Sequence, residues 1–193
     1  VVVLAMAGAF AGPALAQQTP QTAAAAPATA APADAAAAAV QPPAITDPVG
    51  LAIMARLNEL GAASRAEDER AWLQQLVKAY AERAGKPFWV VDSGAPTAAA
   101  VKAAAELAKA AEWGLDPKAY VVPAALTDTS PAAQARAEVQ MSLALVRYAD
   151  HARNGRINPQ DLSLWLDRSY TATDAGKLVS AIATAADPAA VLT

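Results

Sequence analysis

The chain has 193 residues, of which 55% are hydrophobic and 17% charged, and its formal net charge is −3 at pH 7. This length predicts one domain of ordinary size, with or without a tail. Fifteen Lys and Arg against 18 Asp and Glu argue against a nucleic-acid-binding protein, which needs a basic surplus on one face. Cysteine is absent and His151 is the one histidine, which excludes disulfides and a cysteine nucleophile and disfavours histidine-rich metal sites and Ser-His-Asp triads.

Residues 1–16 form an apolar run typical of a secretory signal. The run ends in Ala14-Leu15-Ala16, which places small side chains where signal peptidase requires them. Because a basic n-region and an initiator Met are missing, we interpret the run as a signal truncated at its N-terminus. A retained membrane anchor is the alternative, although 16 residues fall short of the ~20 that a spanning helix needs. The sequence therefore predicts export, without stable membrane insertion after cleavage.

Residues 17–48 are low in complexity. Thirteen of the 17 residues from Ala23 to Ala39 are alanine, and prolines interrupt them. Alanine favours helix, but the prolines remove hydrogen-bond donors and clash with the preceding turn. Because no apolar stripe is present for packing, we expect a disordered Ala/Pro linker.

Charged residues return near Pro48, and a helical domain is predicted for residues 49–193. Apolar residues at helical spacing predict a first helix over Val49–Leu60, with Gly61 as its stop. Ser64 and Glu67 fit a capping box that opens a second helix. Gly85 is expected to close that helix in the left-handed C′ position.

The segment Lys86–Val91 is predicted to be extended, because aromatic and β-branched residues favour that conformation. Thr97 is predicted to cap a third helix that runs to about Trp113 and ends at Gly114. The residues of this helix expected to be available for burial are Val101, Ala104, Ala105, Leu107, Ala108 and Ala111.

Two proline signals mark the next helices. Asp116-Pro117 predicts a short turn to Tyr120, and Ser130-Pro131 predicts the longest helix, ending near Asn154. That helix has two apolar stripes, which predicts a central position. The stripes consist of Val139, Leu143 and Val146, and of Met141, Leu145 and Tyr148.

Two further segments complete the predicted fold. Asn158-Pro159 begins a shorter segment through Trp165, and Thr173 or Asp174 caps a last helix. Period-two alternation is not found beyond the extended segment. The fold class predicted is all-α, a helical bundle with one short extended segment.

Three motifs occur in order along this domain. They are Gly85-Lys86-Pro87-Phe88-Trp89-Val90, then Trp113-Gly114-Leu115-Asp116-Pro117-Lys118-Ala119-Tyr120, then Arg147-Tyr148-Ala149-Asp150 leading to Gly155-Arg156-Ile157-Asn158-Pro159. Together they resemble the N-terminal helical scaffold region of large periplasmic murein L,D-transpeptidases. The resemblance covers about Arg70 to Thr193 and implies a periplasmic protein of a Gram-negative-type envelope.

The resemblance also implies a catalytic domain downstream, with a His and then a Ser-His-Gly-Cys segment whose thiolate is the nucleophile. This chain has no cysteine, so no catalytic residue is carried over, and we predict no metal-binding residue, cofactor site or cofactor. We therefore expect a non-catalytic scaffold, incomplete at its C-terminus, whose partners are the catalytic domain of the same polypeptide and peptidoglycan. The alternative is a stand-alone exported helical binding or adaptor protein without enzymatic activity.

The basic residues near the end of the longest helix are one candidate site. His151 is interpreted as a cation favoured by the helix C-terminus rather than as a metal ligand. The cluster of Arg147, Arg153 and Arg156 could meet anionic cell-wall polymer. Pairing within the molecule, with Asp150 or Asp161, is the preferred interpretation.

The acids and the tryptophans are the other candidates. Glu67, Asp68 and Glu69 resemble a paired-carboxylate site, but acids in a first helical turn complement the helix dipole, and a glycosidase is disfavoured. The four tryptophans could line a glycan groove, although burial in the bundle is the expected outcome. They are Trp72, Trp89, Trp113 and Trp165.

Overall fold

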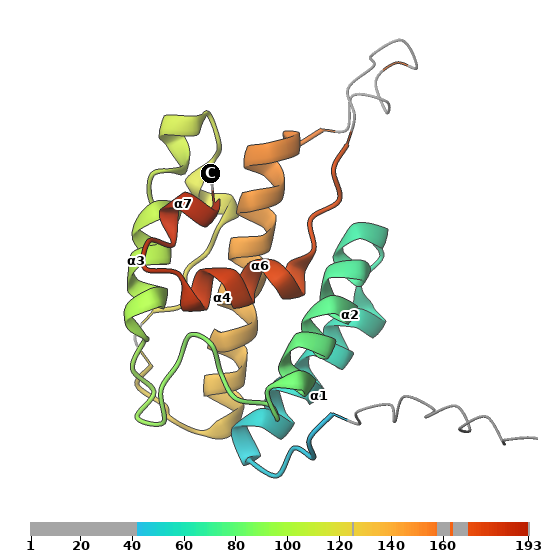
Figure 1. The fold of residues 1–193 in the computed structure, drawn as a ribbon, viewed down its shortest axis with the longest axis vertical. Coiled ribbons are helices and arrows are strands. Elements are labelled where there is room, and N and C mark those ends of the chain that lie inside the picture. The colour runs from blue at the N-terminus through green and yellow to red at the C-terminus, as the bar shows by residue number, and fades with distance from the viewer. Residues whose placement is uncertain (1–41, 125, 158–162, 164–169, 193) are drawn as a thin grey trace, which may run out of the picture. The chain divides into compact units, whose positions relative to one another are not determined.

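The computed structural model describes residues 42–124, 126–157, 163 and 170–192 (Figure 1). Within these residues the regular elements are helices, and the one β contact is an isolated bridge between Val90 and Pro96. The all-α prediction is confirmed over this part of the chain. The predicted signal, most of the linker, and the segment from Asn158 to Trp165 apart from residue 163 lie outside the described residues.

Helix α1 (Pro48–Ala63) begins at Asp47, whose side chain accepts a hydrogen bond from the Gly50 amide at 2.8 Å. The helix continues through Gly61, so the predicted stop there is wrong. A Cβ atom at Gly61 would meet nothing within 4 Å, and the backbone there is helical. The helix ends three residues later, where Ser64 adopts an extended conformation.

Helix α2 (Glu67–Glu82) begins without the predicted capping box. Its N-cap is Ala66, which makes no side-chain cap bond, because Ser64 serves as the C-cap of α1 instead. Glu67 is thus the first residue of α2 rather than the third. The acidic first turn itself is present and suits the positive end of the helix dipole.

The end of α2 has two left-handed residues in succession. Ala84 has φ +56° and occupies the C′ position, and Gly85 follows with φ +77°. The Gly85 amide donates to the Tyr80 carbonyl at 2.8 Å, which completes a Schellman motif. Gly85 is therefore left-handed as predicted, but one residue later than expected. A Cβ atom there would lie 2.8 Å from the Gly50 Cα, so this position also brings α1 close to the chain after α2.

Helix α3 (Ala98–Leu107) is shorter than predicted and continues as the 3₁₀ turn η1 (Ala110–Trp113), which ends at left-handed Gly114. The Thr97 cap is confirmed: its side chain accepts from the Ala100 amide at 3.2 Å. The expected buried face is wrong in part, because Val101 is 55% exposed. The buried residues of this stretch are Ala100, Ala103, Glu106, Leu107 and Ala110. Ala105, Ala108 and Ala111 are exposed, since this stripe turns them away from the neighbouring helices.

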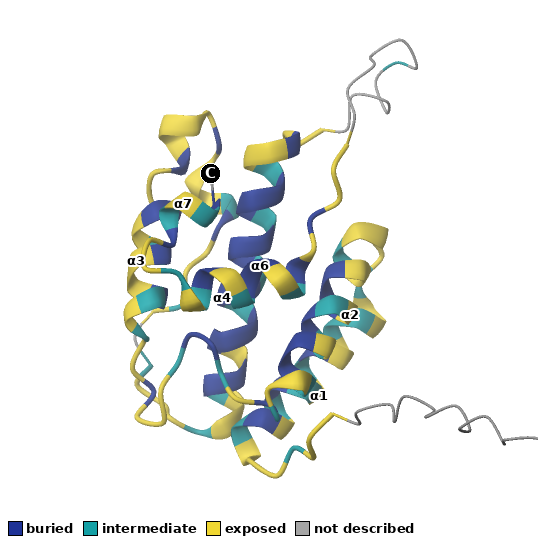
Figure 2. Cartoon of the chain, in the orientation of Figure 1, coloured by how far each residue is buried: buried dark blue, intermediate teal, exposed yellow. Residues whose placement is uncertain are grey.

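Helix α4 (Pro131–Asn154) is the centre of the bundle, as predicted. Ser130 caps it, and it contacts α1, α3, α6 (Ala175–Thr184) and α7 (Ala189–Leu192). Figure 1 shows the other helices arranged around it, and Figure 2 shows buried residues along most of its length. The predicted turn before it is the 3₁₀ element η2 (Pro117–Ala119), capped by Asp116.

The last predicted helix is confirmed as α6, with Asp174 as its cap through a bond from the Lys177 amide. Its buried residues include Leu178, Val179 and Ile182. Across the described residues, none of the helices combines the length and the apolar character required to cross a bilayer.

Candidate functional site

A buried carboxylate on α4 holds the motif at residues 85–90. Glu138 is fully buried and accepts hydrogen bonds from three successive backbone amides, those of Phe88, Trp89 and Val90. The Trp89 and Val90 amides lie 3.0 and 3.1 Å from Oε2. The prediction of an extended segment over Lys86–Val91 is wrong in part, because the chain bends at residues 88 and 89 and turns three successive amides toward this one carboxylate. The chain after α2 is thereby fixed to the central helix.

A polar network extends from this carboxylate through the core. The Tyr80 hydroxyl donates to Glu138 Oε1 at 2.8 Å and lies 2.9 Å from the Ser142 Oγ. Ser142 in turn accepts from the Trp89 indole at 2.7 Å. Burial raises the pKa of Glu138 to about 7, although the amide and hydroxyl donors act to lower it. Sequence analysis missed Glu138; the available signal was an acidic residue between the apolar stripes of a central helix.

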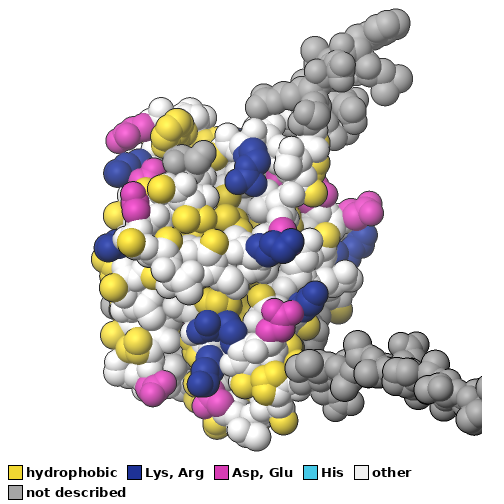
Figure 3. Space-filling view, viewed as in Figure 1, with side chains coloured by type: hydrophobic (Ala, Val, Ile, Leu, Met, Phe, Trp, Pro, Cys, Tyr) yellow, Lys and Arg dark blue, Asp and Glu magenta, His cyan; other side chains and the backbone are white. Residues whose placement is uncertain are grey.

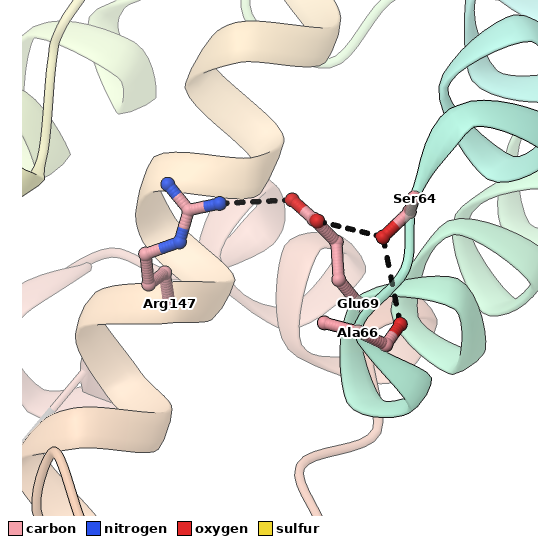
Figure 4. Close-up of polar contacts among 4 residues, drawn as sticks. All are labelled: Ser64, Ala66, Glu69 and Arg147. Carbon is pink, nitrogen blue, oxygen red and sulfur yellow. Dashed lines mark hydrogen bonds and ion pairs between the residues drawn. The ribbon is translucent and has the colours of Figure 1, made fainter.

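The acidic start of α2 is joined to α4 by one ion pair. Arg147 Nη2 lies 2.9 Å from Glu69 Oε1, and Ser64 donates to Glu69 Oε2 at 2.8 Å (Figure 4). Figure 4 shows the guanidinium group of Arg147 reaching from α4 toward Glu69. The preference for pairing within the molecule is confirmed for Arg147, but its partner is Glu69 rather than Asp150. Glu69 thus serves to join two helices.

His151 contacts the second motif. Its Nδ1 lies 2.8 Å from the Tyr120 hydroxyl, and the Tyr120 ring also packs edge-on against Tyr148. Burial lowers the pKa of His151, and Arg156 and Arg147 lower it further, against an opposing effect of Asp150. His151 lies in the last turn of α4 as expected, but the lowered pKa and the contact with Tyr120 argue against its interpretation as a helix-end cation. The hydrogen bond between Tyr120 and His151 links the end of η2 to α4.

Asp150 is buried and anchors the chain just before α6. It accepts hydrogen bonds from Asn154 at 2.9 Å, Tyr170 at 3.0 Å and Thr173 at 3.0 Å. Asn154 also exchanges two bonds with the backbone of Thr171. Among the described residues, Asp150 is thus hydrogen-bonded to uncharged groups and not to the predicted arginines. Asp161, the other acid predicted to pair, lies outside the described residues.

The remaining predicted candidates are dispersed. Trp72 and Trp89 are buried, Trp113 is 58% exposed, and Trp165 lies outside the described residues. The described tryptophans therefore do not share one open groove. Over the same part of the chain, His, Asp and Glu side chains nowhere gather in the groups of three or more needed for a metal ion. Glu67 and Asp68 are exposed at the start of α2.

An open groove with arginines on its walls lies between α1, η2 and α4. Its volume is about 310 Å³, and it is called the arginine groove below. Its principal lining residues are Arg56, Leu60, Val121, Arg136, Leu143 and Arg147. Sequence analysis identified only Arg147 among these arginines. Arg56 joins it only when α1 packs beside α4, and Arg136 lies about three turns earlier on α4 without a local signal.

A second groove of about 250 Å³ is apolar and lies between α3, α4 and the chain after η2. Its lining includes Trp89, Val101, Val122, Leu126 and Met141. Val101 is exposed because its side chain lines this open groove. Both grooves offer contact surfaces. On the face shown in Figure 3, basic and acidic side chains are interspersed among apolar ones.

Comparison with known proteins gives one family. A family model described as Scaffold domain matches residues 74–193, which include the three motifs and the central helix. Neither curated proteins nor solved structures gave a match.

Proposed function

The chain belongs to the Scaffold domain family, and we propose that it is the non-catalytic scaffold part of a peptidoglycan L,D-transpeptidase. In this role it positions a downstream cysteine-dependent catalytic domain for cross-linking or remodelling of murein. The observation that carries the proposal is the family match over residues 74–193, because the three motifs that resemble this class of enzyme fall in the same region.

The contacts of the motifs agree with a supporting role. The first motif is held by Glu138, and the second contributes Tyr120 to the pair with His151. The third places Arg147 against Glu69 and Asp150 against the chain before α6. Each described motif thus joins separate elements of the bundle, as expected of a rigid support.

The proposal includes the compartment. Residues 1–16 are proposed to be a cleaved secretory signal, and the protein is proposed to work in the periplasm, in contact with peptidoglycan. N-terminal sequencing of protein from the periplasmic fraction tests this: the expected first residue is Gln17. Recovery of residues 1–16 in a membrane fraction would contradict it.

The catalytic claim is tested with muropeptides that carry tetrapeptide stems. The purified chain is expected to form no cross-linked dimers and no shortened stems, because it has no cysteine to form an acyl-enzyme. The longer polypeptide that contains its catalytic domain is expected to form both, and a Cys→Ala change there to abolish them. Products from this chain alone, above the level without protein, would overturn the assignment of catalysis to another domain.

A further inference from the structure

We propose that the groove between α3, α4 and the chain after η2, called the apolar groove below, binds an extended, uncharged segment of a partner polypeptide. The partner segment pairs with the main chain of residues 121–124. Two observations carry the inference: the described side chains that line the groove are uncharged, and the main chain in its wall has hydrogen-bonding groups without partners among the described residues. The inference goes beyond the scaffold function and does not depend on murein chemistry.

The lining of the apolar groove offers a ligand no charged group among the described residues. Its one polar side-chain group is the indole N–H of Trp89, which already donates to Ser142 at 2.7 Å. Two of its walls expose valines to solvent: Val101 on α3 is 55% exposed, and Val122 after η2 is 36% exposed. A charged ligand would lose hydration here without gaining a partner, so the lining favours uncharged, apolar side chains.

The wall after η2 is a short segment whose sequence favours an extended backbone. Val121 and Val122 are β-branched, and the position of Val122 before Pro123 disfavours helical geometry. Successive side chains of an extended chain point to opposite faces. The pockets agree with this alternation, because Val121 lines the arginine groove and Val122 lines the apolar groove.

The main chain of this segment is bonded on one side only. The Val121 carbonyl accepts a hydrogen bond from Gln140 of α4 at 3.3 Å. In an extended chain the amide and carbonyl of the next residue point the opposite way, so those of Val122 point away from Gln140. Neither Val122 nor Ala124 makes a main-chain hydrogen bond with any described residue. Unpaired groups two positions apart are what the edge of a sheet offers to an added strand.

An extended peptide uses both features of the groove at once. Its main chain bonds to Val122 and Ala124, while alternate side chains lie over the apolar lining. An acyl chain would fill the groove but leave these main-chain groups to water. The volume of about 250 Å³ lies below the range of small-molecule pockets, roughly 300–1,000 Å³, so the groove suits side chains of a longer segment rather than a whole ligand.

The probe is an acetylated pentapeptide amide of alternating threonine and valine, titrated to millimolar concentration into the isotopically labelled full chain and followed by NMR. We expect saturable chemical-shift changes at Val101, Val122 and Ala124. The comparison ligands are the same peptide methylated at each internal amide nitrogen, the same peptide with glutamate in place of valine, and octanamide. Methylation is expected to weaken binding several-fold, because it removes the main-chain donors of the peptide.

A pair of neighbouring substitutions locates the site. Val122→Asp places a charge in the apolar groove and is expected to weaken binding about tenfold or more, because peptide binding would desolvate that charge. Val101→Asp is expected to weaken it similarly from α3. Val121→Asp is the matched control, since it makes the same change on the side of the arginine groove and should bind as the original chain does. All three variants should fold, because these valines are exposed.

Each adverse outcome overturns a stated part of the proposal. Absence of saturable binding overturns the whole, and equal binding of the methylated peptide overturns the main-chain pairing. Equal or stronger binding of octanamide overturns a polypeptide as the occupant, and equal binding of the glutamate peptide overturns the role of the uncharged lining. Unchanged binding by Val122→Asp, or loss of binding in Val121→Asp, overturns the location. All of these outcomes leave the scaffold function untouched.

Discussion

Replacing Glu138 by Gln tests whether burial or hydrogen bonding controls the central carboxylate. The change keeps the size of the side chain but replaces one acceptor oxygen by an NH₂ donor. If the amide oxygen takes the position of Oε1, the new NH₂ group faces the amides of Trp89 and Val90, which now donate to Oε2. Leaving one such buried donor without a partner costs about 1–3 kcal/mol.

The pH dependence of the free energy of unfolding is a more specific test of the state of Glu138. The pKa of Glu138 is raised from 4.5 to about 7 in the folded chain. Between these values the unfolded chain has released the proton and the folded chain still holds it, so the free energy of unfolding falls as pH rises. A difference of this size corresponds to about 3 kcal/mol, at about 1.4 kcal/mol for each pH unit. This contribution is full below pH 4.5 and lost above about 7.

The assay is urea unfolding of the full chain, followed by tryptophan fluorescence at pH values of about 4.5, 6 and 8. The stability advantage of the original chain over Glu138→Gln should shrink by about 3 kcal/mol across this range. Subtracting the two curves cancels the titration of all other groups. Glu112→Gln, which removes an exposed carboxyl group of η1, is the matched control and should run parallel to the original chain.

The reasoning is refuted if the advantage stays constant or grows as pH rises. Growth would mean that the four donors outweigh burial and hold the pKa of Glu138 below its usual value. The first motif would then be bound by a permanent carboxylate rather than by one that takes up a proton near neutral pH.

Three other predictions follow from the described contacts. Tyr80→Phe should destabilise the fold by about 1–3 kcal/mol in thermal unfolding, because Glu138 and Ser142 lose a hydrogen-bond partner. Tyr148→Phe should be neutral or stabilising in the same thermal unfolding assay, since the buried Tyr148 hydroxyl has no partner among the described residues. Gly85→Ala should lower the stability measured in urea, because φ is +77° and the added Cβ would meet the backbone of Gly50. Gly61→Ala should raise the stability by about 1 kcal/mol, because the position is helical and open, and equal effects of the two variants would contradict this packing. The pKa of His151 measured by NMR should lie below 6.5, so that protonation of His151 lowers the stability of the fold as pH falls below 6.5. A pKa above 6.5 would contradict the burial of His151 against Tyr120.

Much of the bundle could be predicted because its signals are local. The caps at Thr97, Asp116, Ser130 and Asp174 depend on residues within three or four positions, and each is present in the structure. The predicted capping box at Ser64 was wrong, although it too was based on residues close in sequence, because Ser64 ends α1 instead of beginning α2. Two helices meet there, and the residue that ends one could not be distinguished from a residue that begins the next.

The candidate site could be predicted only in part, since its contacts join distant segments. Glu138 binds amides 48 to 50 positions earlier, and Arg147 pairs with an acid 78 positions earlier. Sequence spacing identified Arg147 and His151 as notable residues. It did not identify Glu69 as the partner of Arg147 or Tyr120 as the partner of His151. The arginine groove exists only because α1 lies beside α4, and no local pattern at Arg56 or Arg136 indicates it.

Peptide mapping of the native polypeptide tests the central claim most directly. An antibody against residues 42–193 isolates the protein from the envelope fraction, and mass spectrometry reads the sequence attached to it. The proposed function predicts a polypeptide that continues past Thr193 into a domain with a Ser-His-Gly-Cys segment. A native polypeptide without such a segment would contradict the scaffold role and support a stand-alone binding protein.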